Sequence, residues 1–232
     1  MNTNQATAVG IVLKRTNYGE ADRIVTMVTP DQGKLRLMAR GVRRVKSKLA
    51  GGIELFSVSE LTYIRGRGDI GTLVSARLSR HYGRITGDLR RVQLGYDLIK
   101  TLDKITEDAP EPAYFHLLEH AFAALDDVTI DEAIISLWFD AQLLRLGGHG
   151  PNLQTDTAGS KLIADGTYAF DYNAMAFRPV AGGPFEAAAI KFLRLTFAGC
   201  APKVLQNVQG SATLAAGCIP LVRSIYTQVF GL

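Results

Sequence analysis

The sequence predicts an α+β protein in which a five-stranded β-barrel is followed by a helical domain. Five short segments with strand patterning come first, and from residue 88 the hydrophobic period changes to about 3.6 residues. Short strands in this number favour a closed barrel, because closure leaves no strand edge unpaired. We therefore expect a barrel domain over residues 1–80 and a helical domain over residues 81–232. Residues 148–183, rich in Gly, Asp, Asn and Thr, are expected to form an irregular insert in the second domain.

The expected strands are alternating or β-branched segments bounded by turn signals. Asn17-Tyr18-Gly19 marks the first turn, and Pro30-Asp31-Gln32-Gly33 marks the second. The OB-fold is the commonest barrel of this size that binds single strands, although a count of five strands does not single it out. In chain order the strands cover residues 8–16, 24–29, 34–40, 56–63 and 72–79.

Five amphipathic helices are expected after the barrel. Asp88 and Ser211 are candidate N-caps, and Thr129 has the spacing of a capping box with a glutamate three residues later. Pro220 is expected to kink or split the last helix. The helices begin near Asp88, Pro112, Thr129, Pro184 and Ser211.

Charge is distributed unevenly along the chain. Residues 1–91 contain 17 Lys and Arg against 7 Asp and Glu, whereas residues 92–232 contain 9 against 15. The formal net charge of +4 therefore hides a basic N-terminal part and a mildly acidic remainder.

The basic part is organised around residues 34–48. In an extended strand, Lys34, Arg36 and Arg40 share one face, with side chains roughly 7 Å apart. Phosphates of a single nucleic-acid strand have a comparable spacing, so this pattern favours a nucleic-acid groove. A solvated strand face followed by a charged loop is the structural alternative. The loop contributes Arg43, Arg44, Lys46 and Lys48.

Three further features could extend this basic surface. Tyr18, beside Lys14 and Arg15, is a candidate for stacking on bases, with barrel packing as the alternative. Arg65 precedes and Arg67 lies within the glycine-rich segment Gly66–Gly71, which matches the dinucleotide-binding pattern G-x-G-x-x-G. A strand rather than a helix is expected after this segment, so it is better explained as a hairpin.

The sequence offers one candidate catalytic motif. His116, Glu119 and His120 match the H-x-x-E-H pattern of inverted zinc peptidases, in which two imidazoles bind zinc and the glutamate acts as a base. A solvated helix face carries such residues equally well. No Ser–His–Asp order, P-loop lysine or close acidic pair is evident, so we expect neither an enzyme nor a cofactor.

Compartment signals are few. Cys200 and Cys218 lie in small-apolar runs, which suits buried free thiols in a reducing cytosol. The N-terminal residues lack the pattern of a signal peptide, and no apolar run is long enough to span a membrane.

Ordered blocks in the first 60 residues resemble the RecO family of bacterial recombination mediators. The resemblance continues more loosely through Leu55-Phe56, Tyr63–Gly68, the helices and Gly147–Leu153. The strongest blocks are Gly10-Ile-Val-Leu-Lys14, Tyr18-Gly-Glu-Ala-Asp-Arg-Ile-Val25, Thr29-Pro-Asp-Gln-Gly-Lys-Leu-Arg36 and Ala39-Arg-Gly-Val-Arg-Arg44.

The resemblance implies an N-terminal OB-fold and a C-terminal helical domain in a nucleoid-associated cytoplasmic protein. It also implies binding of single- and double-stranded DNA, work with RecR and the single-strand DNA-binding protein, strand annealing and indirect recombinase loading, all without nucleotide hydrolysis. The acidic tail of the single-strand DNA-binding protein would need an apolar groove with a basic rim. Candidate cations for that rim are Lys100, Lys104 and Arg145.

One departure from the family concerns zinc. Many members carry a four-cysteine zinc module before the last helices, with cysteines expected near residues 154–159 and 177–183. This chain has no cysteine there, so we expect a degenerate, zinc-module-like segment that binds no metal and is held by packing alone. Two other functions remain open: a zinc-dependent hydrolase, and an adaptor barrel that binds an acidic protein partner instead of DNA.

Overall fold

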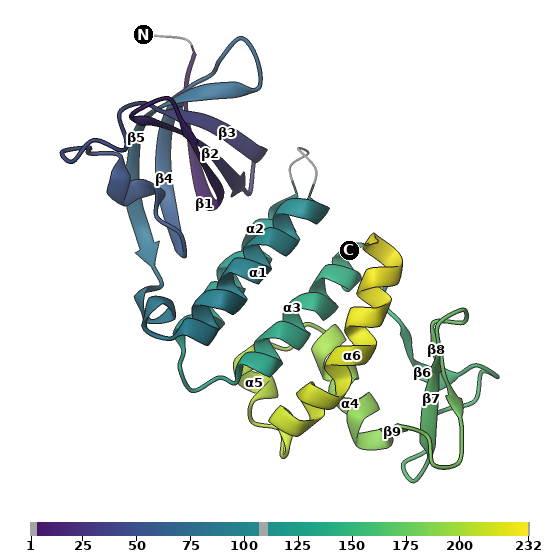
Figure 1. The fold of residues 1–232 in the computed structure, drawn as a ribbon. Coiled ribbons are helices and arrows are strands. Elements are labelled where there is room, and N and C mark those ends of the chain that lie inside the picture. The colour runs from purple at the N-terminus through teal and green to yellow at the C-terminus, as the bar shows by residue number, and fades with distance from the viewer. Residues whose placement is uncertain (1–3, 107–110, 232) are drawn as a thin grey trace. The chain divides into compact units, whose positions relative to one another are not determined.

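The computed structural model describes residues 4–106 and 111–231. The chain divides into two compact units, Met1–Asp127 and Val128–Leu232. Figure 1 shows the barrel and two helices of the first unit and the helices and small sheet of the second. No helix among the described residues is long and apolar enough to cross a membrane.

The first unit begins with a closed barrel whose strand order is β1-β2-β3-β5-β4. Only β3 and β5 pair in parallel, and the other neighbours are antiparallel. The five predicted strands are thus confirmed, with ends that differ by a few residues. The strands are β1 (Gln5–Tyr18), β2 (Asp22–Thr29), β3 (Gly33–Ala39), β4 (Ser57–Ile64) and β5 (Ile70–His81).

The barrel interior is filled by alternate side chains of its strands. Val25 and Leu37 are cross-strand partners on β2 and β3, and both are fully buried. Tyr63 is only 2% exposed and belongs to this core. The short 3₁₀ helix η1 (Ala50–Ile53) packs on β5, where Ala76 leaves no room for a side chain at Gly52.

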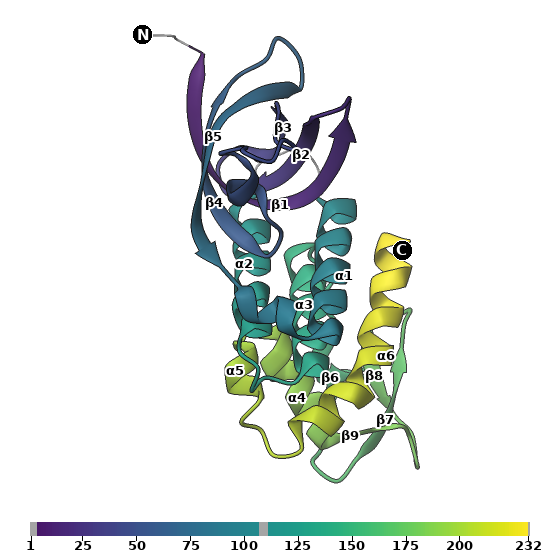
Figure 2. The same ribbon diagram turned by 60° about the vertical axis from the view of Figure 1, so that its left-hand side comes forward.

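A helical hairpin packs against the barrel in the same unit (Figure 2). It consists of α1 (Leu89–Ile105) and α2 (Pro112–Asp126), and α1 follows the 3₁₀ helix η2 (Gly83–Gly87). Phe56 packs edge-on against Tyr96 of α1 and Phe122 of α2, with ring centroids 5.5 Å apart in both pairs. A Cβ atom at Gly95 would lie 2.6 Å from the Phe56 ring, so glycine permits this close approach.

The ends of the hairpin follow the sequence signals. Asp88 caps α1 by accepting hydrogen bonds from the backbone N–H groups of Arg90 and Arg91, and Pro112 is the first residue of α2. The buried Arg91 donates to the Leu125 carbonyl at 2.8 Å and to the Asp127 carbonyl at 3.4 Å. The guanidinium therefore satisfies carbonyls that the end of α2 leaves without helical partners.

The second unit is built on helices whose starts differ in part from the predictions. Asp131, rather than Thr129, caps α3, because its carboxylate accepts from Ala133 N–H. Gly210 precedes α6, in which Ser211 is the first residue, and Pro220 does not split this helix. The predicted start at Pro184 is early by three residues. The helices are α3 (Glu132–Leu146), α4 (Ala187–Phe197), α5 (Pro202–Leu205) and α6 (Ser211–Phe230).

The prediction of an irregular insert at residues 148–183 is wrong, because this segment contributes three strands to a small sheet of order β6-β8-β7-β9. Its strands are too short to produce a readable alternation. Phe177 is fully buried, with the rings of Phe170 and Phe185 edge-on at 5.1 and 5.4 Å. Packing of aromatic rings therefore holds the segment. The strands are β6 (Asn152–Asp156), β7 (Thr167–Asp171), β8 (Ala176–Pro179) and β9 (Phe185–Glu186).

The contact between α3 and α6 contains a partly buried acid, whose side chain is 16% exposed. Asp140 lies 3.9 Å from the guanidinium of Arg223, which also donates to Ser136 Oγ at 3.4 Å. Burial raises the pKa of Asp140 from 3.8 to about 6, and Arg223 opposes this shift only in part. Because the folded pKa lies above the unfolded value, ionisation favours the unfolded chain.

We predict that the free energy of unfolding falls as pH rises from about 4 to about 6, and that Asp140→Asn removes this fall. At pH 7.5 the variant gains at most roughly 3 kcal/mol over the wild type. Urea unfolding at pH 4.5 and 7.5 measures the difference, with the exposed Asp165→Asn as the control. An equal effect of Asp140→Asn at both pH values would contradict the assignment.

Candidate nucleic-acid interface

The strand register places cations in a row across the outer face of the barrel. Lys14 of β1 pairs with Thr26 of β2, and Thr26 pairs with Arg36 of β3. Cross-strand partners point to the same side of a sheet, and two strand spacings separate the backbones of Lys14 and Arg36 by about 10 Å. The shift in register between Val12 and Lys14 is what brings Lys14 onto this face. The sequence placed both cations near the groove but did not show that they align.

The same outer face continues toward the end of the strands. By alternation, Tyr18 lies on the side of Lys14, while Met38 and Arg40 lie on the side of Arg36. Tyr18 is the last residue of β1 and is 57% exposed, and Arg40 is exposed just after β3. This end of the face is therefore open, with an aromatic ring among its cations.

At the other end of the face, Lys34 differs from its strand neighbours. Its ammonium lies 3.0 Å from Asp103 Oδ1 and also donates to the Asp103 backbone carbonyl. The side chain is only 9% exposed, so α1 covers it. The alternation correctly gives the face on which Lys34 lies, but Lys34 connects the barrel to the helical hairpin.

The predicted basic loop, which we define as residues 41–48, is held by successive turns. Arg44 N–H donates to the Gly41 carbonyl, and Ser47 N–H donates to the Arg44 carbonyl. Gly41 N–H donates to the Asp22 carboxylate at 2.7 Å, which attaches the start of the loop to β2. The cationic members Arg43, Arg44, Lys46 and Lys48 are all exposed.

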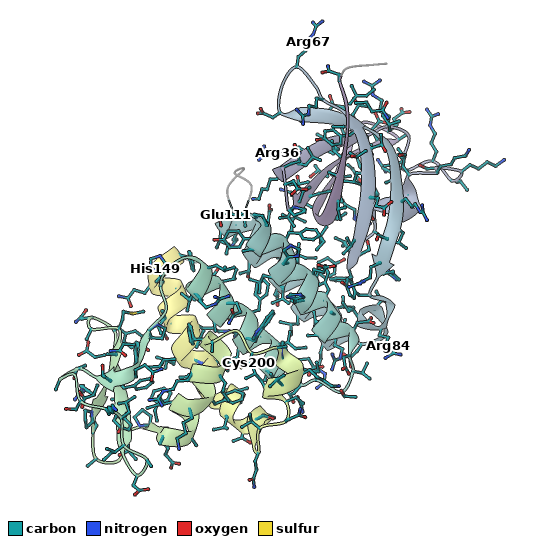
Figure 3. All side chains as sticks on the ribbon, turned by 180° about the vertical axis from the view of Figure 1, so that it is seen from behind. Arg36, Arg67, Arg84, Glu111, His149 and Cys200 are labelled. Carbon is teal, nitrogen blue, oxygen red and sulfur yellow. The ribbon has the colours of Figure 1, made fainter. Side chains whose placement is uncertain are left out.

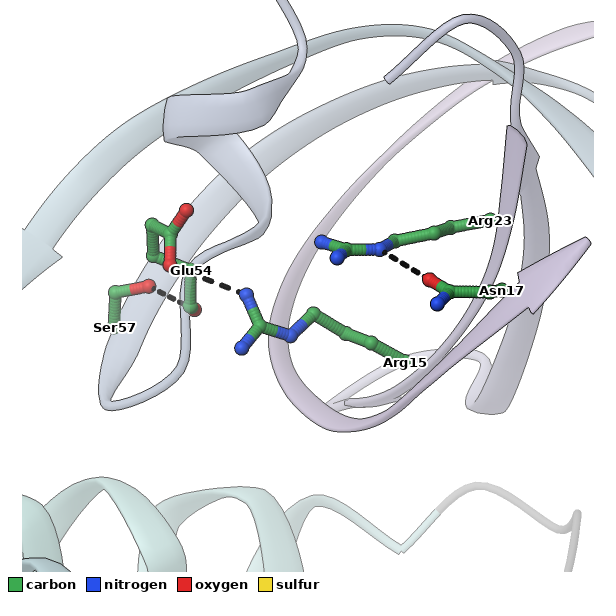
Figure 4. A network of polar contacts seen from close by, with 5 residues as sticks. All are labelled: Arg15, Asn17, Arg23, Glu54 and Ser57. Carbon is green, nitrogen blue, oxygen red and sulfur yellow. Dashed lines mark hydrogen bonds and ion pairs between the residues drawn. The ribbon is translucent and has the colours of Figure 1, made fainter. Parts of the chain in front are cut away.

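Two arginines of neighbouring strands, Arg15 of β1 and Arg23 of β2, each contact a polar side chain (Figure 4). Arg15 lies 3.2 Å from Glu54, and Arg23 donates to Asn17 Oδ1 at 2.9 Å. Arg23 is not among the candidates predicted from the sequence, because it directly precedes a β-branched run and lies outside the cationic cluster of residues 34–48. The partial neutralisation of Arg15 makes it a weaker candidate for a phosphate contact than the loop cations.

The glycine-rich segment is a hairpin tip, as predicted. It connects β4 to β5, and no helix follows that could place its N-terminus at a pyrophosphate. Arg65 and Arg67 are exposed there. In Figure 3 the Arg67 side chain projects away from the barrel at the end opposite Arg84 of the same unit.

The H-x-x-E-H motif does not form a metal centre. Glu119 lies 3.5 Å from His116 Nδ1 and 3.6 Å from Arg80, while His120 is exposed. No group of three His, Cys, Asp or Glu residues within the described parts of the chain could hold a metal ion. The geometry therefore gives no support to the zinc hydrolase alternative.

The three candidate cations for a partner's tail do not lie on one element. Lys100 and Lys104 are exposed on α1 of the first unit. Arg145 is exposed on α3 of the second unit, where it donates to Gln142 Oε1 at 2.8 Å. Their spacing on α1 puts Lys100 and Lys104 on one side of that helix.

A closed five-stranded barrel with this topology, followed by helices, defines an OB-fold-type barrel protein with a helical second part. Sequence comparison gives the family. The profile described as recombination protein O N terminal matches residues 1–86, and the one described as recombination protein O C terminal matches residues 87–231. The chain therefore belongs to the RecO family.

Curated relatives agree with this family. Proteins named DNA repair protein RecO from Dehalococcoides mccartyi and Roseiflexus sp. are 30% and 31% identical over 199 and 211 residues. These matches cover 79% and 89% of this chain, and 75% and 71% of the relatives. A third, from Exiguobacterium sibiricum, is 32% identical over 167 residues, which cover 72% of this chain and 66% of the relative.

We predict that Lys34→Met destabilises the first unit without changing how DNA binding depends on salt. Removing the ammonium leaves the Asp103 carboxylate and carbonyl without their partner, at a cost of about 1–3 kcal/mol in the free energy of unfolding. Arg36→Met, on the same strand and face, is the matched control and should reduce the salt dependence. Urea unfolding and a salt titration of oligonucleotide binding measure the two effects. A lower salt slope for Lys34→Met would assign Lys34 to the interface.

Proposed function

We propose that this protein is a non-enzymatic DNA-binding mediator in recombinational DNA repair. The name shared by its relatives, DNA repair protein RecO, supports the repair role. The row of Lys14 and Arg36 across the outer face, continued by the basic loop, is the observation that supports DNA contact. We assign this contact to the barrel domain, residues 1–80, and partner docking to the helical part.

The proposed mechanism is electrostatic. Two complementary strands repel each other through their phosphates, and cations placed along a backbone release condensed counterions and reduce that repulsion. The exposed loop cations have no acidic side chain among residues 41–48 to neutralise them. Bringing strands together in this way requires neither a nucleophile nor a cofactor. Such contacts read phosphates and not base edges, so binding should be largely indifferent to sequence.

Partner contacts extend the same proposal. The family resemblance supports work with RecR and with the single-strand DNA-binding protein, whose acidic tail would meet Lys100 and Lys104 of α1 or Arg145 of α3. Recombinase loading would follow indirectly, once the strand has been handed over.

We predict that Arg44→Gln/Lys46→Gln/Lys48→Gln weakens binding of a single-stranded oligonucleotide about tenfold or more at low salt. The slope of log affinity against log salt should fall by about 2, because each lost phosphate contact removes about 0.7. Fluorescence anisotropy across a salt series gives both quantities. The matched control, Lys161→Gln/Arg178→Gln/Lys191→Gln, removes three exposed cations of the second unit and should leave the slope unchanged.

The annealing step is tested with complementary oligonucleotides coated with the cognate single-strand DNA-binding protein. The wild type and the control should anneal them, and the loop variant should do so more slowly. If the loop variant binds and anneals like the wild type, the basic loop is not the DNA contact. If the wild type binds no DNA, the adaptor alternative replaces the mediator, and competition with an acidic protein becomes the informative measurement.

A further inference from the structure

The basic loop carries an apolar residue at its most exposed point. Val45 has a relative exposure of 104%, the highest among the large apolar side chains of the described residues. It lies between Arg44 and Lys46, in a segment that projects from the side of the barrel in Figure 1. A single exposed valine is ordinary by itself, but the hydrogen bonds of the loop hold this one in a defined position.

The backbone on both sides of Val45 is fixed. A turn from Gly41 to Arg44 precedes it, a turn from Arg44 to Ser47 contains it, and Val42 is 4% exposed and packs in the barrel core. After the tip, Leu49 N–H donates to Ser47 Oγ at 3.3 Å. Val45 therefore lies in a loop ordered by hydrogen bonds, which reduces the conformational entropy that the loop loses when a ligand contacts it.

The loop is also attached to the turn that carries Tyr18. Arg43 N–H donates to the Ala21 carbonyl at 2.9 Å, and Arg43 Nη1 donates to the Gly19 carbonyl at 3.3 Å. Tyr18 directly precedes Gly19, and its ring is 57% exposed. Val45 follows Arg43 by two residues, so the hydrogen bonds of Arg43 join the two segments that carry an exposed aromatic ring and an exposed aliphatic group.

We propose that Val45, together with Tyr18, contacts the faces of unstacked bases, and that this contact makes the barrel prefer single-stranded nucleic acid to duplex. The inference rests on the proposed function and adds a preference that charge alone does not supply. Phosphates are present in both forms, whereas base faces are open to an apolar side chain only where bases are unstacked. Tyr18 would supply stacking, and Val45 would supply apolar contact from the basic loop.

The test is Val45→Gln, which keeps a side chain of moderate size at an exposed position and leaves the loop hydrogen bonds of Arg44, Ser47 and Leu49 available. Affinity for a single-stranded oligonucleotide should fall about fivefold, by loss of part of the contact with one base. Affinity for a duplex of the same length and the salt slope should not change. Val204→Gln, an exposed valine of α5, is the matched control.

A second variant reports the contact directly. The only tryptophan, Trp138, is 5% exposed, so Val45→Trp introduces a solvent-exposed indole that can be followed by its own emission. Single-stranded oligonucleotide should quench this emission strongly, and duplex at the same occupancy should do so weakly.

The two proposals fail in different ways. Equal loss of affinity for single strands and duplex in Val45→Gln, no loss at all, or equal quenching by both forms would overturn the base contact while leaving the cationic interface intact. A wild type that binds DNA without salt dependence would overturn the proposed function itself.

Discussion

Which part of the barrel's outer face is exposed depends on the contacts that hold the helical hairpin against one end of the barrel. Phe56 adopts a positive φ of 55°, which is uncommon for a residue other than glycine, and inserts its ring against Gly95 of α1 and Phe122 of α2. Lys34 adds an ion pair to the same helix. Together these contacts hold the hairpin against the end of the outer face where β3 begins. The opposite end, at Tyr18 and Arg40, stays open, and the basic loop is attached there.

The sequence predicted the barrel well because a half-buried strand records its two environments in alternation. The sequence could not show that Lys34 is covered by α1, because alternation shows which face a residue occupies and not which element packs on that face. The small sheet at residues 152–186 escaped prediction for a different reason: β9 has two residues and β8 has four, too few for a period to be read. Asp131 replaced Thr129 as the cap of α3 because either residue type can accept the first free N–H groups, and only the backbone path selects between them.

In the segment without cysteines, packing of aromatic rings joins the short strands. A structural zinc site ties distant short strands together through a few strong bonds. Here Tyr168 occupies a comparable central place: it is 2% exposed, and its hydroxyl accepts from Ile163 N–H at 2.8 Å. Its backbone lies so close to Gly183 that a Cβ atom there would be 2.6 Å away. The Phe177 ring completes the small core, so ring packing and the Tyr168 hydroxyl join these short strands.

Charge and apolar contact would have separate consequences for strand pairing. A purely cationic surface binds a duplex at least as well as a single strand, because the duplex has the higher charge density, and it would tend to retain its own product. Contacts with base faces act in the opposite direction, since pairing and stacking remove those faces from Tyr18 and Val45. The cations of the outer face and loop would then gather the strands, while the loss of apolar contact on pairing would favour release of the duplex. A barrel with exposed apolar groups among its cations can therefore promote pairing without using the free energy of a covalent reaction.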